Sequence, residues 1–182
     1  SDVGWVVGHS YIVYAPLIHG CTTILFEGKP VRTPDPGAFW RVCDEYKVDA
    51  LFSAPTAFRA IKKEDPEGEF LKQYDLAKLK TIFMAGERLD PPTLEWVQSK
   101  ADKPGIDHWW QTETGGILIT PLPGATALKP GSATRPFFGV KPEIVDANGV
   151  VQNGACEGNL VISESWPGQM RTVYGDHKRF ME

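Results

Sequence analysis

Residues 107–116, DHWWQTETGG, combine side chains that suit a ligand site better than a packed core. Two adjacent tryptophans are followed by an amide, two hydroxyls, one carboxylate and two glycines, whereas a core strand would carry apolar residues continuously or at alternate positions. The Thr112 hydroxyl can bind phosphate oxygens, and the Glu113 carboxylate is a hard ligand that suits Mg²⁺. The alternative is a strand ending in a polar turn, with Glu113 as a solvated loop carboxylate.

Strand-like and helix-like segments alternate before this string. We expect strands at residues 22–26, 50–53, 80–84 and 106–110, and helices at residues 9–18, after Asp35-Pro36, at residues 55–63 and after Asp90. This order predicts right-handed crossovers and an α/β fold, a mainly parallel sheet with flanking helices. Ligands of such sheets bind beyond the carboxyl ends of the strands. We therefore expect the loops SAPTA, AGERLD and WWQTETGG to open on one edge.

The character of the chain changes near residue 121, where proline and glycine recur and helical spacing stops. Residues 140–145 and 158–162 are strand-like, and Asn148 with Gly149 is typical of a hairpin turn. We therefore divide the chain into an α/β subdomain, residues 1–120, and a β-rich subdomain, residues 121–182, truncated at its C-terminal end.

Composition excludes several classes of function. The chain has 182 residues, 42% hydrophobic content and a formal net charge of −4, which argues against a nucleic-acid surface. No apolar run approaches the roughly 20 residues that cross a bilayer, and no secretory signal opens the chain, so we expect no membrane and an intracellular, cytoplasmic location, or the mitochondrial matrix in a eukaryote. Three scattered cysteines predict ordinary buried or half-buried thiols. No G-x-G-x-x-G follows the first strand, which disfavours an NAD-dependent oxidoreductase.

Six motifs in order give the chain a family resemblance over essentially its whole length. They are GWVVGHSYIVY, APTAFRA, AGER, DHWWQTETGG, KPGSATRPFFG and SWPGQMRTVYGDHKRF. The chain resembles the short-chain acyl-CoA synthetases, the acetyl- and propionyl-CoA synthetases of the AMP-forming, adenylate-forming superfamily. The resemblance implies ATP/AMP, Mg²⁺ and coenzyme A as cofactors, with a short-chain carboxylate as the other substrate. It leaves the oligomeric state open.

The resemblance also assigns roles at the nucleotide. Thr112 would contact the α-phosphate, Glu113 would hold Mg²⁺, and the remaining nucleotide-binding positions would be Gly86, Glu87, Arg88, Asp107, His108, Trp109 and Gln111. Acetyl-type members often have proline where this chain has Arg88. That side chain would stack on the base or point to solvent.

The acyl pocket implied by the resemblance consists of Val6, Val7, Ala85 and Trp110, and Ala54 would lie in the tunnel for coenzyme A. Acetyl-type members tend to carry valine at the position of Ala85. The missing methyls leave room for about one or two more carbons, a difference usually worth about 1 to 3 kcal/mol of discrimination. Propionate is therefore the expected substrate, with acetate second.

The same family has parts that this sequence lacks, namely the lysine-bearing phosphate loop before residue 1 and the hinge and mobile C-terminal domain after residue 182. We expect an internal fragment that is inactive alone. The alternative is a non-catalytic nucleotide-binding or interaction module that retains the pocket loops.

Overall fold

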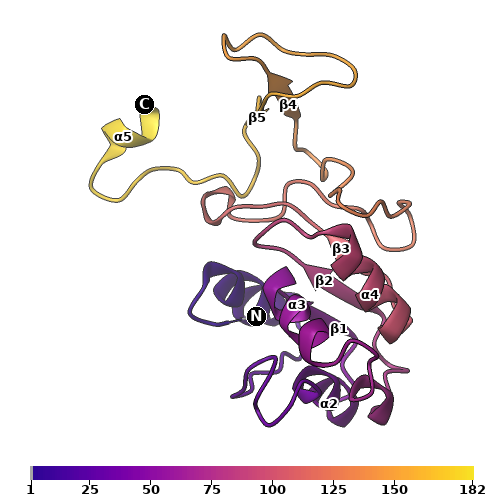
Figure 1. The fold of residues 1–182 in the computed structure, drawn as a ribbon. Helices are drawn as coiled ribbons and strands as arrows, with labels where there is room; N and C mark the ends of the chain where they lie inside the picture. The colour runs from indigo at the N-terminus through magenta and orange to yellow at the C-terminus, as the bar shows by residue number, and fades with distance from the viewer. Residues whose placement is uncertain (1) are drawn as a thin grey trace.

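The computed structural model describes residues 2–182. Its helices and strands, in chain order, are η1 (Gly8–Tyr14), α1 (Ala15–His19), α2 (Ala38–Glu45), β1 (Ala50–Ser53), α3 (Pro55–Glu64), η2 (Leu71–Gln73), β2 (Thr81–Met84), α4 (Pro91–Ala101), β3 (Gly105–Asp107), η3 (Thr112–Thr114), β4 (Pro142–Val145), β5 (Asn159–Ile162) and α5 (His177–Met181). Figure 1 shows an α/β layer from which the β4–β5 hairpin and the C-terminal arm project.

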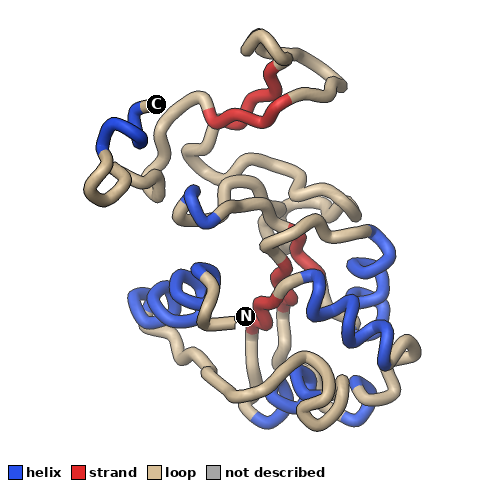
Figure 2. The backbone as a smooth tube through the Cα atoms, turned by 60° about the vertical axis from the view of Figure 1, so that its left-hand side comes forward, coloured by secondary structure: helices blue, strands red, loops and turns tan. Residues whose placement is uncertain are grey.

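The parallel sheet has the strand order β1-β2-β3, and β1 and β2 are each followed by a helix and then by the neighbouring strand. Helices α2, α3 and α4 cover one face of this sheet, and the N-terminal helix lies on the other (Figure 2). This arrangement confirms the α/β fold class that the alternating pattern predicted.

The main core lies between the sheet and helices α2, α3 and α4. Trp40, Phe58 and Ile61 are fully buried there, and they pack in one cluster with Ile82 and Met84 of β2. Apolar residues at helical spacing produce this arrangement because they form a single stripe on each helix. Truncation of such a buried aromatic side chain typically costs about 3 to 5 kcal/mol.

The N-terminal helix was predicted, but its geometry was not. A π-helical stretch, η1, runs directly into α1, which ends at Gly20 in the left-handed conformation. Pro16 has no N–H to donate to the carbonyl of residue 12, and the Thr23 hydroxyl donates to that Ile12 carbonyl instead, at 2.5 Å. The chain is thereby folded back along its own helix.

Three expectations were wrong in detail. Residues 22–26 form no strand, because no other strand of the described chain pairs with them. The third strand ends at Asp107 instead of Trp110, because β2, its partner, ends at Met84. Of the cysteines, Cys43 is buried and burial raises its pKa to about 12, but Cys21 and Cys156 are exposed.

The last third of the chain holds a two-stranded antiparallel sheet, β4 with β5. Asn148 and Gly149 lie in the tight turn after β4, in which the Gly149 N–H donates to the Asp146 carbonyl at 3.1 Å. The boundary at residue 120 stays a prediction. Within residues 2–182, no helix has the length and apolar content needed to cross a bilayer.

Candidate functional site

The three strand-end loops open on one edge of the sheet. Ser53, Met84 and Asp107, the last residues of the three strands, are paired side by side in the parallel register. Each loop therefore starts at the same level, as the loop positions in the sequence predicted. Ala54, which the resemblance assigned to the coenzyme A tunnel, is half-buried and is the N-cap of α3.

The AGERLD loop between β2 and α4 is held to helix α3. Ala85 is buried, whereas Gly86, Glu87 and Arg88 are exposed. Gly86 has a φ of 103°, a conformation in which any other residue would be strained. The Glu87 carboxylate accepts a hydrogen bond from the Thr56 N–H at 2.9 Å and also pairs with Arg59. The side chain expected at the adenine therefore binds the first turn of α3 in this structure.

The WWQTETGG loop is organised around Thr114. Its buried hydroxyl accepts from the Gln111 N–H at 3.1 Å and lies 2.8 Å from the Gln111 carbonyl and 2.9 Å from the Gly116 carbonyl. Gln111, Thr112 and Glu113 are exposed on this turn. The side chains of Thr112 and Glu113 have no hydrogen-bond or ion-pair partner within residues 2–182. A fixed backbone thus presents a hydroxyl and a carboxylate to the surface.

Asp107 and His108 lie at the end of β3 and both have perturbed titrations. Burial raises the pKa of the Asp107 carboxyl to about 6 and lowers the pKa of the His108 imidazole to about 4. His108 is buried and stacks on Phe83, with ring centroids 5.5 Å apart and planes 10° apart. Its Nε2 atom has no hydrogen-bond partner among the described residues. The ring is therefore neutral at pH 7 and belongs to an aromatic layer.

This aromatic face of the sheet, opposite the main core, comprises Tyr11, Phe52, Phe83, His108 and Trp110. Tyr11 comes from η1 and lies 5.5 Å from Phe52 and 5.7 Å from Trp110, between ring centroids. Its hydroxyl accepts from the backbone N–H of residue 117 at 2.9 Å, and burial raises its pKa.

Most acyl-pocket candidates lie at or beside this aromatic face. Val6 and Val7 are half-buried and directly precede η1, the helix that carries Tyr11. Trp110 is buried, and its ring contacts Tyr11. Trp109 is half-buried and pairs as an isolated antiparallel bridge with Ile119, since β2 gives it no partner. The chain thus brings the N-terminal helix to the side of the sheet from which Trp110 extends.

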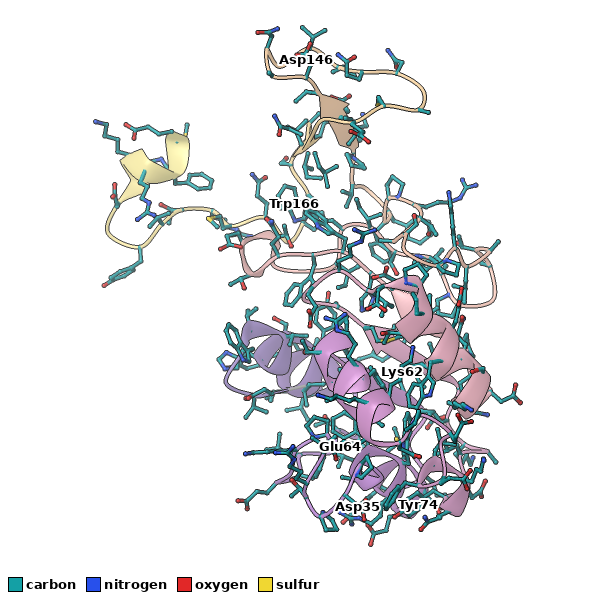
Figure 3. All side chains as sticks on the ribbon, viewed as in Figure 1. Asp35, Lys62, Glu64, Tyr74, Asp146 and Trp166 are labelled. Atoms are coloured by element: carbon teal, nitrogen blue, oxygen red, sulfur yellow. The ribbon has the colours of Figure 1, made fainter. Side chains whose placement is uncertain are left out.

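A distant segment also supports the WWQTETGG loop. The indole N–H of Trp166 donates to the Thr114 carbonyl at 2.8 Å, and Figure 3 shows Trp166 at the junction of the hairpin and the α/β layer. Gly115 has a φ of 72°, and a Cβ there would meet the Gly168 carbonyl oxygen at 2.2 Å. Two backbones are therefore in direct contact at this point.

Three supporting residues were missed from the sequence, namely Tyr11, Arg59 and Trp166. Tyr11 and Trp166 fall inside motifs of the resemblance but carried no signal of their contacts. Arg59 likewise falls inside the motif APTAFRA, at residues 54–60, without a signal of its two carboxylate partners. Their partners lie between 28 and 106 residues away along the chain.

The oxygen donors of Thr112 and Glu113 suit a Mg²⁺ ion that arrives with a nucleotide, and not an ion held by protein ligands alone. In the part of the chain that the structure describes, no three His, Cys, Asp or Glu side chains gather as a metal-binding group. Mg²⁺ is commonly held by one or two carboxylates together with substrate phosphates, which a lone exposed Glu113 beside Thr112 can satisfy. A cavity of about 590 Å³ lies elsewhere, over residues 126–136, and none of the candidate residues lines it.

Comparisons with known proteins show the family of the chain. A family described as AMP-binding enzyme matches residues 1–174. The acetyl-coenzyme A synthetases of Xanthobacter autotrophicus and Brucella anthropi are 58% and 57% identical to the chain, over 99% and 100% of its length. The chain spans 28% of the length of each of these relatives.

A solved structure extends the comparison to the fold. The anthranilate CoA ligase AuaEII, in complex with anthranoyl-AMP, superposes with a TM-score of 0.79 at 20% sequence identity. The match covers 97% of this chain and 33% of that one. At this identity the likeness concerns the arrangement of strands and helices.

Proposed function

Because the chain belongs to the AMP-binding enzyme family, we propose that it works as part of an AMP-forming short-chain acyl-CoA synthetase. The observation that carries the proposal is the rigid turn with exposed Thr112 and Glu113, at the same sheet edge as the AGERLD loop. High identity to acetyl-CoA synthetases over the whole chain supports the same reaction class. The full reaction needs residues beyond this chain, because it spans 28% of those relatives.

The proposed reaction has two steps. A carboxylate oxygen attacks the α-phosphorus of ATP, an acyl–O–P bond forms, and pyrophosphate leaves with the electrons of the broken P–O bond. The sulfur of coenzyme A then attacks the acyl carbon, loses its proton, and displaces AMP. Such transfers depend on positioning and on charge stabilisation more than on a protein nucleophile.

The nucleotide roles follow from the chemistry of the exposed groups. The Thr112 hydroxyl donates to an α-phosphate oxygen, and Glu113 holds Mg²⁺, which neutralises phosphate charge when bound. Gly86, Glu87 and Arg88 line one side of the adenine, and Asp107, His108, Trp109 and Gln111 line the other. The loops of β2 and β3 leave neighbouring strands at one level, which supports a single pocket between them.

A direct test uses the full-length protein that contains this chain. We expect ATP–pyrophosphate exchange that depends on a short-chain acid, and loss of at least tenfold in exchange rate for Thr112→Ala and Glu113→Gln. Both side chains are exposed and unpaired within residues 2–182. The free energy of unfolding of each variant should therefore differ from that of the wild type by no more than about 0.5 kcal/mol, as is usual for surface substitutions. A wild-type protein that binds AMP without exchange would support the alternative, a non-catalytic nucleotide-binding module.

The acid is proposed from the pocket residues Val6, Val7, Ala85 and Trp110. Ala85 is small and buried, which supports propionate as the preferred acid and acetate as the second. Ala85→Val adds two methyl carbons and should shift the ratio of kcat/KM from propionate toward acetate by about 10-fold. Ala125→Val adds the same volume at an exposed position and is the matched control. An unchanged ratio in Ala85→Val would remove this residue from the acyl pocket.

The 182-residue chain by itself should catalyse neither step. Phosphate contacts are expected from segments that this sequence does not contain, and adenylate formation needs them in place. Exchange by the isolated chain at a rate near that of the full-length protein would contradict this expectation.

Ala54, the N-cap of α3, is proposed to line the tunnel for coenzyme A. The effect of Ala54→Leu on the KM for coenzyme A tests that role.

A further inference from the structure

Arg59 of helix α3 bridges two carboxylates of the AGERLD loop. Its guanidinium Nη1 lies 2.8 Å from the Asp90 Oδ1 atom, and its Nη2 pairs with the Glu87 carboxylate. A planar guanidinium can hold two carboxylates in fixed directions, which a lysine ammonium cannot. The three side chains are each a little over one-third exposed, so the bridge lies at the rim of the loop.

Each carboxylate also fixes the end of a helix. Glu87 accepts from the Thr56 N–H in the first turn of α3. Asp90 is the N-cap of α4, and it accepts from the Thr93 N–H at 3.1 Å and from the Thr93 hydroxyl at 2.7 Å. The bond from the Thr93 hydroxyl, followed by those from Arg59 and from the Thr93 N–H, lowers the pKa of Asp90 to about 2. The loop is thus tied at residues 87 and 90 to two helix N-termini, with Arg59 between them.

The loop has few other attachments. Leu89 is its one fully buried side chain, while Gly86, Glu87 and Arg88 are exposed. Beyond the loop, the Lys62 ammonium donates to the Pro92 carbonyl at 2.7 Å, so a second basic residue of α3 holds the start of α4 (Figure 3). The path of residues 86–88 therefore depends on Leu89 and on the Arg59 bridge.

We infer that Arg59 is a positioning residue for the nucleotide, which it does not touch. It holds residues 86–88 in the conformation that meets the adenine, and it neutralises two carboxylates near a negatively charged ligand. The inference rests on the proposed function of the loop. Without Arg59, the Glu87 and Asp90 carboxylates lose the positive charge that they share. The loop then loses its fixed path, and the two uncompensated negative charges repel the nucleotide.

The test is steady-state kinetics of the full-length protein with Arg59→Ala and Arg59→Lys. We expect the KM for ATP to rise about three- to tenfold in Arg59→Ala, the range for losing one or two partly exposed ion pairs. The KM for the acid should stay within twofold, because Val6, Val7 and Trp110 of the proposed acyl pocket belong to other segments, and Ala85 is buried at the start of the loop, before residues 86–88. Arg59→Lys, which keeps the positive charge but lacks the planar fork of the guanidinium, should recover part of the lost ATP affinity.

Arg41→Ala is the matched control, since Arg41 makes an exposed ion pair with Glu45 on α2 at 3.1 Å. It should change neither KM. If Arg59→Ala does not fold, Asp90→Asn removes one of the two ion pairs but keeps an acceptor for the Thr93 N–H, and it should raise the KM for ATP by a smaller factor. A KM for ATP equal to that of the wild type in the folded variant would overturn the inference.

The outcomes separate this inference from the proposed function. A wild-type protein without acid-dependent exchange would refute the synthetase proposal, whatever Arg59 does. An active wild type whose Arg59 variant raises both KM values equally, in step with lower thermal stability, would assign Arg59 a merely structural role and overturn the inference alone.

Discussion

The buried His108 should make the protein lose stability in mild acid. The folded-state pKa of its imidazole is about 4, against the ordinary value of 6.5, because burial opposes the charged form. Between these two values the unfolded chain binds a proton that the folded chain does not. The free energy of unfolding therefore falls as the pH drops from about 6.5 to about 4, and His108 adds no slope above pH 7.

The size of the effect follows from the difference of about 2.5 between the two pKa values. At 1.36 kcal/mol for each pKa unit, the full loss is about 3 kcal/mol, and about 2 to 3 kcal/mol is lost by pH 4.5. Asp107 works in the opposite direction. Its folded-state pKa is raised to about 6, so it favours the fold at low pH and this gain is lost as the pH rises from about 4 to 6.

His108→Phe separates the two groups, because phenylalanine keeps an aromatic ring against Phe83 but does not titrate. Urea unfolding followed by tryptophan fluorescence, at pH 7.5 and 4.5, gives the free energies, and the six tryptophans provide the signal. The wild type should lose about 2 to 3 kcal/mol more than the variant over this range. Asp107 is present in both proteins and cancels in the difference. Equal losses in the two proteins would refute the reasoning.

Two further predictions concern contacts that hold the site together. Tyr11→Phe removes the acceptor of the Ile117 N–H and should lower the free energy of unfolding by about 1 to 3 kcal/mol in the same urea assay, whereas Tyr14→Phe, at an exposed position of the same helix, should have no effect. Trp166→Phe removes the donor to the Thr114 carbonyl and should speed amide hydrogen exchange in residues 111–116 without changing it in α4, as measured by mass spectrometry; unchanged exchange in that loop would show that the indole bond does not restrain it.

The elements of the sheet could be predicted because their signals are local. The strand at residues 50–53 has the predicted bounds, and α3 and α4 begin at the Pro55 and Pro91 that opened their patterns. Proline at the first helical position needs no N–H partner, so it marks a helix start directly. The common edge of the loops then followed from the parallel order of the strands.

The errors and omissions have a different cause, since they depend on partners far along the chain. Residues 22–26 have a strand-like composition, but a strand also needs a neighbour with which to pair. The Trp166 bond spans 52 residues and the Tyr11 bond 106. Such contacts depend on tertiary structure, and a sequence pattern over 10 to 20 residues does not report them. The roles of the individual site residues stay predictions.

The backbone contact between Gly115 and Gly168 has a consequence for how the chain can change over evolutionary time. Gly115 cannot acquire a side chain without pushing the Gly168 carbonyl away from the turn, so this position is constrained by a segment 53 residues further along the chain. Insertions and deletions between Gly115 and Gly168 should be tolerated only if they keep the contact between the two backbones. The β4–β5 hairpin lies between these two residues in the sequence. Its length should therefore vary more readily than the residue at position 115.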